Sequence, residues 1–130
     1  MATIFTKLIQ GELPSHRVHE DDAHFACLDI NPIQPGHTLV IPKREVDQMF
    51  DLAPDELADL WRFAQVVAAK LKDETGCARI VSVVVGYEVP HVHVHLIPTN
   101  ELDDYPIPPR GTLDHEAAAG FAERMQARFA

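Results

Sequence analysis

The sequence predicts an α+β fold in which a mostly antiparallel sheet is covered by one long helix and followed by a C-terminal helix. Between Pro54 and Gly76 apolar residues recur every three or four positions, which is the spacing of one buried helix face. Before and after this helix, short runs rich in β-branched residues alternate with turn-forming residues, as strands and turns do. Together these two observations predict a single domain over residues 1–130.

Five segments have the composition of strands. They are residues 16–20, 23–29, 37–41, 79–85 and 91–98. Asp21–Asp22 joins the first two into a hairpin, Pro42 ends the third, and Gly86–Pro90 turns the chain before the fifth.

Three segments are expected to be helical. Thr3–Gln10 has a hydroxyl cap and a following glycine, and Pro54 stands at a favoured first position of the long helix that ends near Gly76. The predicted buried face of the long helix comprises Leu57, Leu60, Trp61, Ala64, Val67, Ala68 and Leu71. Residues 114–129 form the last helix, whose apolar residues are Ala118, Phe121, Met125 and Phe129.

Composition excludes several classes of partner. The formal charge of −9 repels a phosphate backbone, so we expect no nucleic-acid partner. No apolar run approaches the roughly 18 residues of a membrane span, and no signal peptide precedes the first helix, so we expect no membrane partner and a cytoplasmic location. Cys27 and Cys77 lie outside any C-x-x-C motif and are expected to be buried thiols.

The residues with the clearest chemical meaning are His91-Val92-His93-Val94-His95. Alternate side chains of a strand share a face, so the three imidazoles are expected on one side and the apolar residues in the core. Three interpretations are open. The histidines can be surface residues, zinc ligands that need a third group from elsewhere, or a catalytic row.

Covalent catalysis at phosphorus is the interpretation we favour. A histidine near its ordinary pKa is largely neutral at pH 7, so it can attack without an activating base. His93 is the expected nucleophile because it is central. Its two neighbours can then fix its ring and donate to phosphate or to the leaving group.

The motif resembles the histidine triad (HIT) signature, and other segments are similar to the family in the same order. These segments are Ile4-Phe5-x-Lys7-Leu8-Ile9, Glu20-Asp21-Asp22, Asp29-Ile30-Asn31-Pro32, residues 35–43 and Asp51-Leu52. The resemblance covers about residues 3–100 and is closest to the Hint-like branch. Residues 101–130 are then a C-terminal extension of a single HIT-like fold.

The resemblance implies a homodimer that binds a purine nucleotide or nucleoside phosphoramidate and forms a nucleotidyl intermediate on His93. It implies that His91 orients His93 and that His95 contacts phosphate or leaving group, with His37 as a further histidine near the triad. Asp29 would hold the ribose hydroxyls. The base pocket would be lined by Ile4, Phe5, Leu8, Cys27 and Ile30. No cofactor and no metal are expected.

The turn before the triad is the remaining predicted part of the site, through Gly86, Glu88 and Val89. Gly86 lets backbone amides approach a phosphate. Many family members carry an asparagine and a Gly-Gln-Ser-like stretch here, whereas this chain has Glu88 where a small donor is expected. The leading hypothesis is a purine nucleoside phosphoramidase. The alternatives are a dinucleoside polyphosphate hydrolase and a nucleotide-binding module with little turnover.

Overall fold

The fold is described from a computed structural model that covers residues 2–130. The chain forms α1 (Ile4–Ile9), β1 (Arg17–Glu20), β2 (His24–Leu28) and β3 (Thr38–Pro42), and then the long α2 (Pro54–Thr75). After α2 come β4 (Arg79–Val83), β5 (Val94–Thr99) and α3 (His115–Phe129). Short 3₁₀ turns occupy Met49–Asp51 and Leu102–Asp104. The predicted α+β class and the order of its elements are confirmed.

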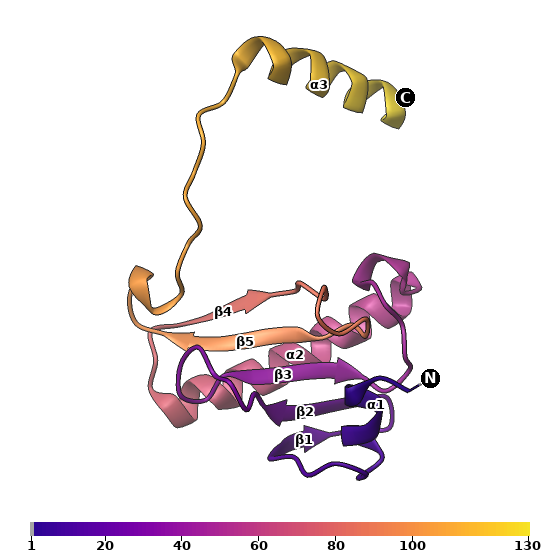
Figure 1. The fold of residues 1–130 in the computed structure, drawn as a ribbon, viewed down its shortest axis with the longest axis vertical. Coiled ribbons are helices and arrows are strands. Elements are labelled where there is room, and N and C mark those ends of the chain that lie inside the picture. Colours follow the sequence, from indigo (N-terminus) through magenta and orange to yellow (C-terminus); the bar gives the residue numbers. More distant parts are fainter. Residues whose placement is uncertain (1) are drawn as a thin grey trace.

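All five strands form one antiparallel sheet in the order β1-β2-β3-β5-β4. The triad strand β5 therefore lies inside the sheet, between β3 and β4 (Figure 1). On β5, His95 lies opposite Leu39 of β3 on one side and Val83 of β4 on the other. An interior strand is held by hydrogen bonds on both edges, which gives a reacting group on it a rigid support.

Each face of the sheet has its own core. On one face α2 packs against buried strand residues that include Val92, Val94 and Leu96. On the other face the short α1 contributes Phe5, which packs with Phe25, Cys27, Leu39 and Ile41. As predicted, the apolar residues of the triad motif point to α2, so the histidines are left for the α1 face.

The long helix follows its prediction with one exception. It begins at Pro54 and ends where Gly76 adopts a left-handed conformation with φ of +67°. Leu60, Ala64 and Val67 are buried as predicted. Trp61 is 39% exposed, however, whereas Phe63, absent from the predicted face, is buried. Trp61 is a single position from Leu60, so it lies about 100° around the helix from the buried side.

The predicted strand over residues 91–98 begins too early, because β5 starts only at Val94. Val94 pairs with Val40, and continuing this ladder would bring Val92 opposite Pro42, which has no N–H to donate. The Val92 N–H instead donates to the carbonyl of Val46 at 2.8 Å. His91 thus lies at a bend and His93 in irregular chain just before the strand.

The C-terminal helix stands away from the sheet. An extended segment after Tyr105 leads to α3, which lies beyond the β4 edge (Figure 1). Asp114 caps its first turn through the N–H of Ala117. None of its residues is buried, and Phe121 and Phe129 are 60% and 84% exposed. Within residues 2–130, no helix has the length and apolar character needed to cross a membrane.

Candidate active site

The geometry around His93 leaves one ring nitrogen free for chemistry. Its Nδ1 lies 2.7 Å from the backbone carbonyl oxygen of His91. A carbonyl can only accept, so Nδ1 carries the proton and Nε2 keeps its lone pair. The ring of Phe5 packs edge-on against this imidazole with centroids 4.6 Å apart. Of its two nitrogens, Nε2 is therefore the nucleophilic one.

A second chain of hydrogen bonds sets the tautomer of His95. The N–H of Ile33 donates to Nδ1 of His37 at 3.0 Å, so the neutral His37 carries its proton on Nε2. That Nε2 lies 2.9 Å from Nδ1 of His95, to which it donates. His95 must then hold its own proton on Nε2. This places a hydrogen-bond donor beside the nucleophile, with the His93 and His95 ring centroids 4.9 Å apart.

His91 is buried and supports the site through its backbone carbonyl. Its side chain is fully buried, and its Nε2 donates to the carbonyl of Pro42 at 2.8 Å. The ring thus does not reach the pocket, while its backbone carbonyl holds His93. Phe5 packs against both His91 and His93, so these rings lie on the α1 face of the sheet, as predicted. Of the three imidazoles, however, only His93 and His95 are at the site, whereas the His91 ring is buried behind them.

Burial keeps the two site histidines neutral. Desolvation lowers the pKa of His93, with the carbonyl of His91 opposing the shift and charge on His91 adding to it. Desolvation, together with His93 and His37, lowers the pKa of His95 to about 4. The pKa of His37 is lowered by burial as well, against the carboxylate of Asp29. Both site rings are therefore in the form that the hydrogen bonds require.

Among residues 2–130 three possible metal ligands lie together, but only one of them, His95, belongs to the triad. Donor atoms of Asp29, His37 and His95 all lie within 4.8 Å of one another. Asp29 Oδ2 is 3.6 Å from His37 Nε2, the same nitrogen that donates to His95. A metal ion here would have to replace that proton, so the hydrogen-bonded chain and metal ligation are mutually exclusive.

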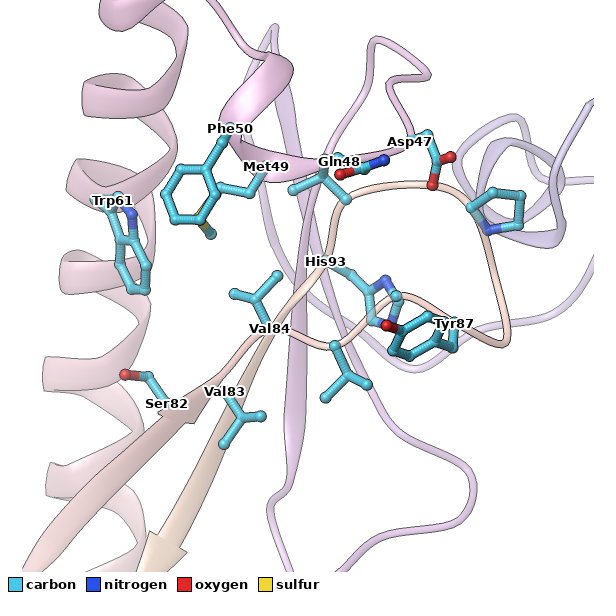
Figure 2. A pocket seen from close by; sticks show the side chains of 14 residues that line it. Asp47, Gln48, Met49, Phe50, Trp61, Ser82, Val83, Val84, Tyr87 and His93 are labelled. Atoms are coloured by element: carbon cyan, nitrogen blue, oxygen red, sulfur yellow. The ribbon is translucent and has the colours of Figure 1, made fainter. Parts of the chain in front are cut away.

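A groove of about 650 Å³ begins at His93 and runs toward α2. Figure 2 shows Trp61 projecting from the helix and Phe50 from the preceding loop, both facing Val84, with Tyr87 next to His93. Its lining is mainly apolar, and among the described residues that line it Asp47 is the one charged side chain. Sequence reasoning missed Phe50 and misassigned Trp61, since both are apolar residues whose exposure depends on tertiary packing.

A family model described as the HIT domain matches residues 10–102, which include the whole triad. The chain belongs to the HIT family.

Relatives within the HIT family differ in their activities. An uncharacterised HIT-like protein of Methanocaldococcus jannaschii is 39% identical over 104 residues, which is 77% of this chain and 81% of the relative. An adenosine 5'-monophosphoramidase of Saccharomyces cerevisiae is 36% identical, over 77% of this chain and 64% of its own length. A bis(5'-adenosyl)-triphosphatase of Dictyostelium discoideum is also 36% identical, over 61% of this chain and 56% of its own length.

The similarity to a solved structure of the HIT family extends over the full chain. A crystal structure of a HIT family member from Bacillus subtilis is 28% identical, with a TM-score of 0.84 over 100% of this chain and 99% of that chain. The characterised relatives named above are hydrolases of nucleotide substrates, either a phosphoramidate or a dinucleoside triphosphate.

Residues predicted to hold the nucleotide in this HIT protein divide into buried and exposed groups. Phe5 and Cys27 are buried in the core on the α1 face, with Leu8 packed against them. Burial, followed by the charge of Asp29, raises the pKa of the Cys27 thiol to about 11, so it stays protonated. Ile4 and Ile30 are exposed beside this core, at 48% and 81%.

Of the three predicted residues in the turn before the triad, Gly86 lines the groove at His93. Gly86 has φ of +87° and lies on the groove together with His93, as expected of a backbone that bends toward a ligand. Glu88 is exposed, and its charge is among the smaller influences on His93, whose pKa it raises. Val89 packs on the α1 core beside Phe5. These placements leave the predicted roles of the three residues as predictions.

Proposed function

We propose that this protein is a purine nucleoside phosphoramidase of the Hint-like branch, which acts through a nucleotidyl-His93 intermediate. The observation that carries the proposal is the hydrogen bond from His93 Nδ1 to the His91 carbonyl, which leaves Nε2 as a free nucleophile. The similarity to an adenosine 5'-monophosphoramidase supports the choice of substrate.

In the first step Nε2 of His93 attacks the α-phosphorus, the P–Nε2 bond forms and the P–N bond to the amine breaks. The amine departs with one added proton taken up from solvent. The ring gains positive charge as it is nucleotidylated, and the His91 carbonyl stabilises that charge through the Nδ1 proton. His95 donates its Nε2 proton as a hydrogen bond to a phosphate oxygen or to the leaving nitrogen.

In the second step water attacks the same phosphorus and the P–Nε2 bond breaks. The products are a nucleoside monophosphate and neutral His93, and the proton taken up in the first step is released. The net reaction consumes one water for each P–N bond. Because burial lowers the pKa of His93, the regenerated ring is neutral and ready for another turnover.

The groove beyond His93 supports an amine over a nucleotide as leaving group. Among the residues that the structure describes, its lining holds Asp47 and no lysine or arginine, so these side chains offer no cation to bind a second set of phosphates. Phe50 and Trp61 instead offer an apolar surface to a neutral group. The dinucleoside polyphosphate hydrolase remains the second candidate, because of the similarity to a bis(5'-adenosyl)-triphosphatase.

The test is mass spectrometry of the protein quenched during turnover of adenosine phosphoramidate, beside His93→Ala. We expect a nucleotidyl adduct on His93 in the parent protein and neither adduct nor product in the variant. Unchanged hydrolysis by the variant would refute the mechanism. Faster release of nucleotide from a dinucleoside triphosphate under the same conditions would instead favour the second candidate.

Tight binding of AMP or GMP without any adduct would point to the nucleotide-binding module. The metal alternative is tested in parallel. We expect full activity in chelator and no stoichiometric zinc after purification. Loss of activity in chelator would indicate instead that Asp29, His37 and His95 bind a metal ion, and that His37 does not donate a hydrogen bond to His95.

We also propose that the chain is a cytoplasmic homodimer and that α3 contributes to its interface. Phe121 and Met125 lie on one side of α3 and are exposed, although a detached helix needs apolar burial to be stable in water. The Bacillus subtilis structure matches this fold over the whole chain, which includes α3.

Light scattering after gel filtration measures the oligomeric state. We expect a dimer that Phe121→Glu shifts toward monomer. Ala127→Glu is the matched control, since it places the same charge about 120° from Phe121 around α3 and about 160° from Met125. A monomeric parent protein would contradict the dimer. Cell fractionation tests the location.

A further inference from the structure

Three polar residues outside the predicted site meet beneath His91. The hydroxyl of Thr3 lies 2.7 Å from His91 Nδ1. Thr6 donates its hydroxyl proton to Glu45 Oε1 at 2.8 Å, and the backbone N–H of Thr3 donates to the same oxygen at 2.8 Å. Glu45 comes from the loop after β3, 42 residues from Thr3, so tertiary folding alone brings the cluster together.

The donors and acceptors of this cluster have one consistent arrangement for neutral His91. Its Nε2 carries the proton because the Pro42 carbonyl can only accept, so Nδ1 is an acceptor. Thr3 must therefore use its single hydroxyl proton on His91. The same hydroxyl oxygen accepts the N–H of Thr6 at 3.2 Å, which is the cap of α1.

Helix capping by itself does not explain this arrangement. A cap needs only the lone pairs of the Thr3 oxygen, whereas here the proton also has a buried partner. Glu45 is exposed, yet it holds both Thr3 and Thr6, and these contacts lower its pKa, with the N–H of Thr3 as the largest cause. The carboxylate thus fixes the first turn of α1 to the loop that follows β3.

The consequence reaches the proposed nucleophile in two ways. With both ring nitrogens of His91 bonded, its ring and backbone are fixed, including the carbonyl that accepts from His93. The same first turn of α1 carries Phe5, which packs against the His93 ring. The cluster therefore positions both groups that contact His93: the His91 carbonyl, which accepts from Nδ1, and the Phe5 ring.

We propose that Thr3, Thr6 and Glu45 are positioning residues that hold His91 in its Nε2–H tautomer and thereby orient His93. This inference rests on the proposed role of His93 as nucleophile. It assigns the N-terminal helix a part in catalysis that the triad motif does not contain.

The experiment compares Thr3→Val, which removes the hydroxyl with little change of shape, with Thr3→Ser, which keeps it. We expect Thr3→Val to lower kcat for adenosine phosphoramidate by about tenfold to a hundredfold, because small misplacements of reacting groups have large effects on rate. KM should change far less, and Thr3→Ser should restore kcat. Glu45→Gln, which keeps an acceptor oxygen, should stay near the parent, whereas Glu45→Ala should resemble Thr3→Val.

Nitrogen-15 NMR of the His91 ring gives a readout that does not depend on activity. In the parent protein Nδ1 should have the shift of an unprotonated nitrogen and Nε2 that of a protonated one. Thr3→Val should shift the Nδ1 signal toward that of a nitrogen without a hydrogen-bond donor or change the tautomer, and circular dichroism checks that the variant is folded.

Unchanged kcat together with an unchanged His91 spectrum in folded Thr3→Val would reduce Thr3 to a helix cap and overturn the proposal. If the parent protein shows no phosphoramidase activity, the proposed function fails first. The His91 spectra of Thr3→Val and Thr3→Ser still decide whether the cluster sets the tautomer.

Discussion

At the scale of single residues, the hydrogen-bond donor or acceptor opposite each imidazole decides its chemistry. The His91 carbonyl makes Nε2 of His93 a nucleophile, and the Ile33 N–H, acting through His37, makes Nε2 of His95 a donor. Both states require neutral rings. Burial in the sheet supplies this condition by disfavouring the charged form.

The pH dependence of kcat/KM for adenosine phosphoramidate follows from this neutrality. Protonation of His93 removes its nucleophile, and its pKa lies below the ordinary value of 6.5. We therefore expect kcat/KM to be level from pH 8 down to about 6.5 and to decline only at lower pH. Initial rates between pH 4.5 and 8.5 measure this, after subtraction of uncatalysed hydrolysis. A decline centred above pH 6.5 would contradict it.

At the scale of elements, adjacent residues of α2 have different roles, one in the core and one in the groove. Leu60 is fully buried against the sheet, whereas Trp61 is part of the groove that leads from His93. The helix thus stabilises the fold with one face and shapes the site with its flank. The late start of β5 similarly frees His91 and His93 from ladder pairing, so that side-chain and loop contacts can place them.

Because Leu60 stabilises the core and Trp61 lines the groove, we expect alanine variants at these two positions to have different effects. Leu60→Ala leaves a cavity in the core and should lower the free energy of unfolding by about 2–5 kcal/mol. Trp61→Ala should cost less than half of that, while it raises KM for substrates with large apolar amines. Urea unfolding at one fixed protein concentration and steady-state kinetics measure the two effects. Equal destabilisation by both variants would contradict this expectation.

At the scale of the whole molecule, the buried histidines make stability depend on pH. His37, His93 and His95 have lowered pKa values in the folded state, while unfolded histidines titrate near 6.5. Below pH 6.5 the unfolded chain binds more protons than the folded one. The stability that these groups contribute is therefore complete above pH 6.5 and is lost as pH falls toward about 4, the pKa of His95.

We accordingly expect a lower melting temperature at pH 5 than at pH 7.5. Carboxylates with lowered pKa values, such as Glu20 and Glu56, lose their contribution mainly below about pH 4.5 and so act in a different range. His95→Asn should reduce the pH dependence, since it removes a histidine whose pKa is lowered to about 4. Equal melting temperatures at the two pH values would show that the histidines are not buried as described.

The sequence alone determined the fold class, the order of elements and the central motif. These features depend on local periodicity and turn chemistry, as in the helix between Pro54 and Gly76. Which face the apolar residues of the motif occupy was also predictable, because alternation along an extended chain fixes it. The resemblance to the HIT family added His37 and Asp29, which the structure places next to His95.

Only the tertiary structure decided how those residues work. Thr3 contacts His91 and Glu45 across 88 and 42 residues of sequence, and an ordinary threonine has no motif to mark it. Ile33 acts on His37, only four residues away, but through a backbone N–H, which has no motif either. The burial of His91 and the exposure of Trp61 depend on what packs against them, not on their own periodicity. Tautomers follow for the same physical reason, because they are set by whichever donor or acceptor folding places opposite each nitrogen.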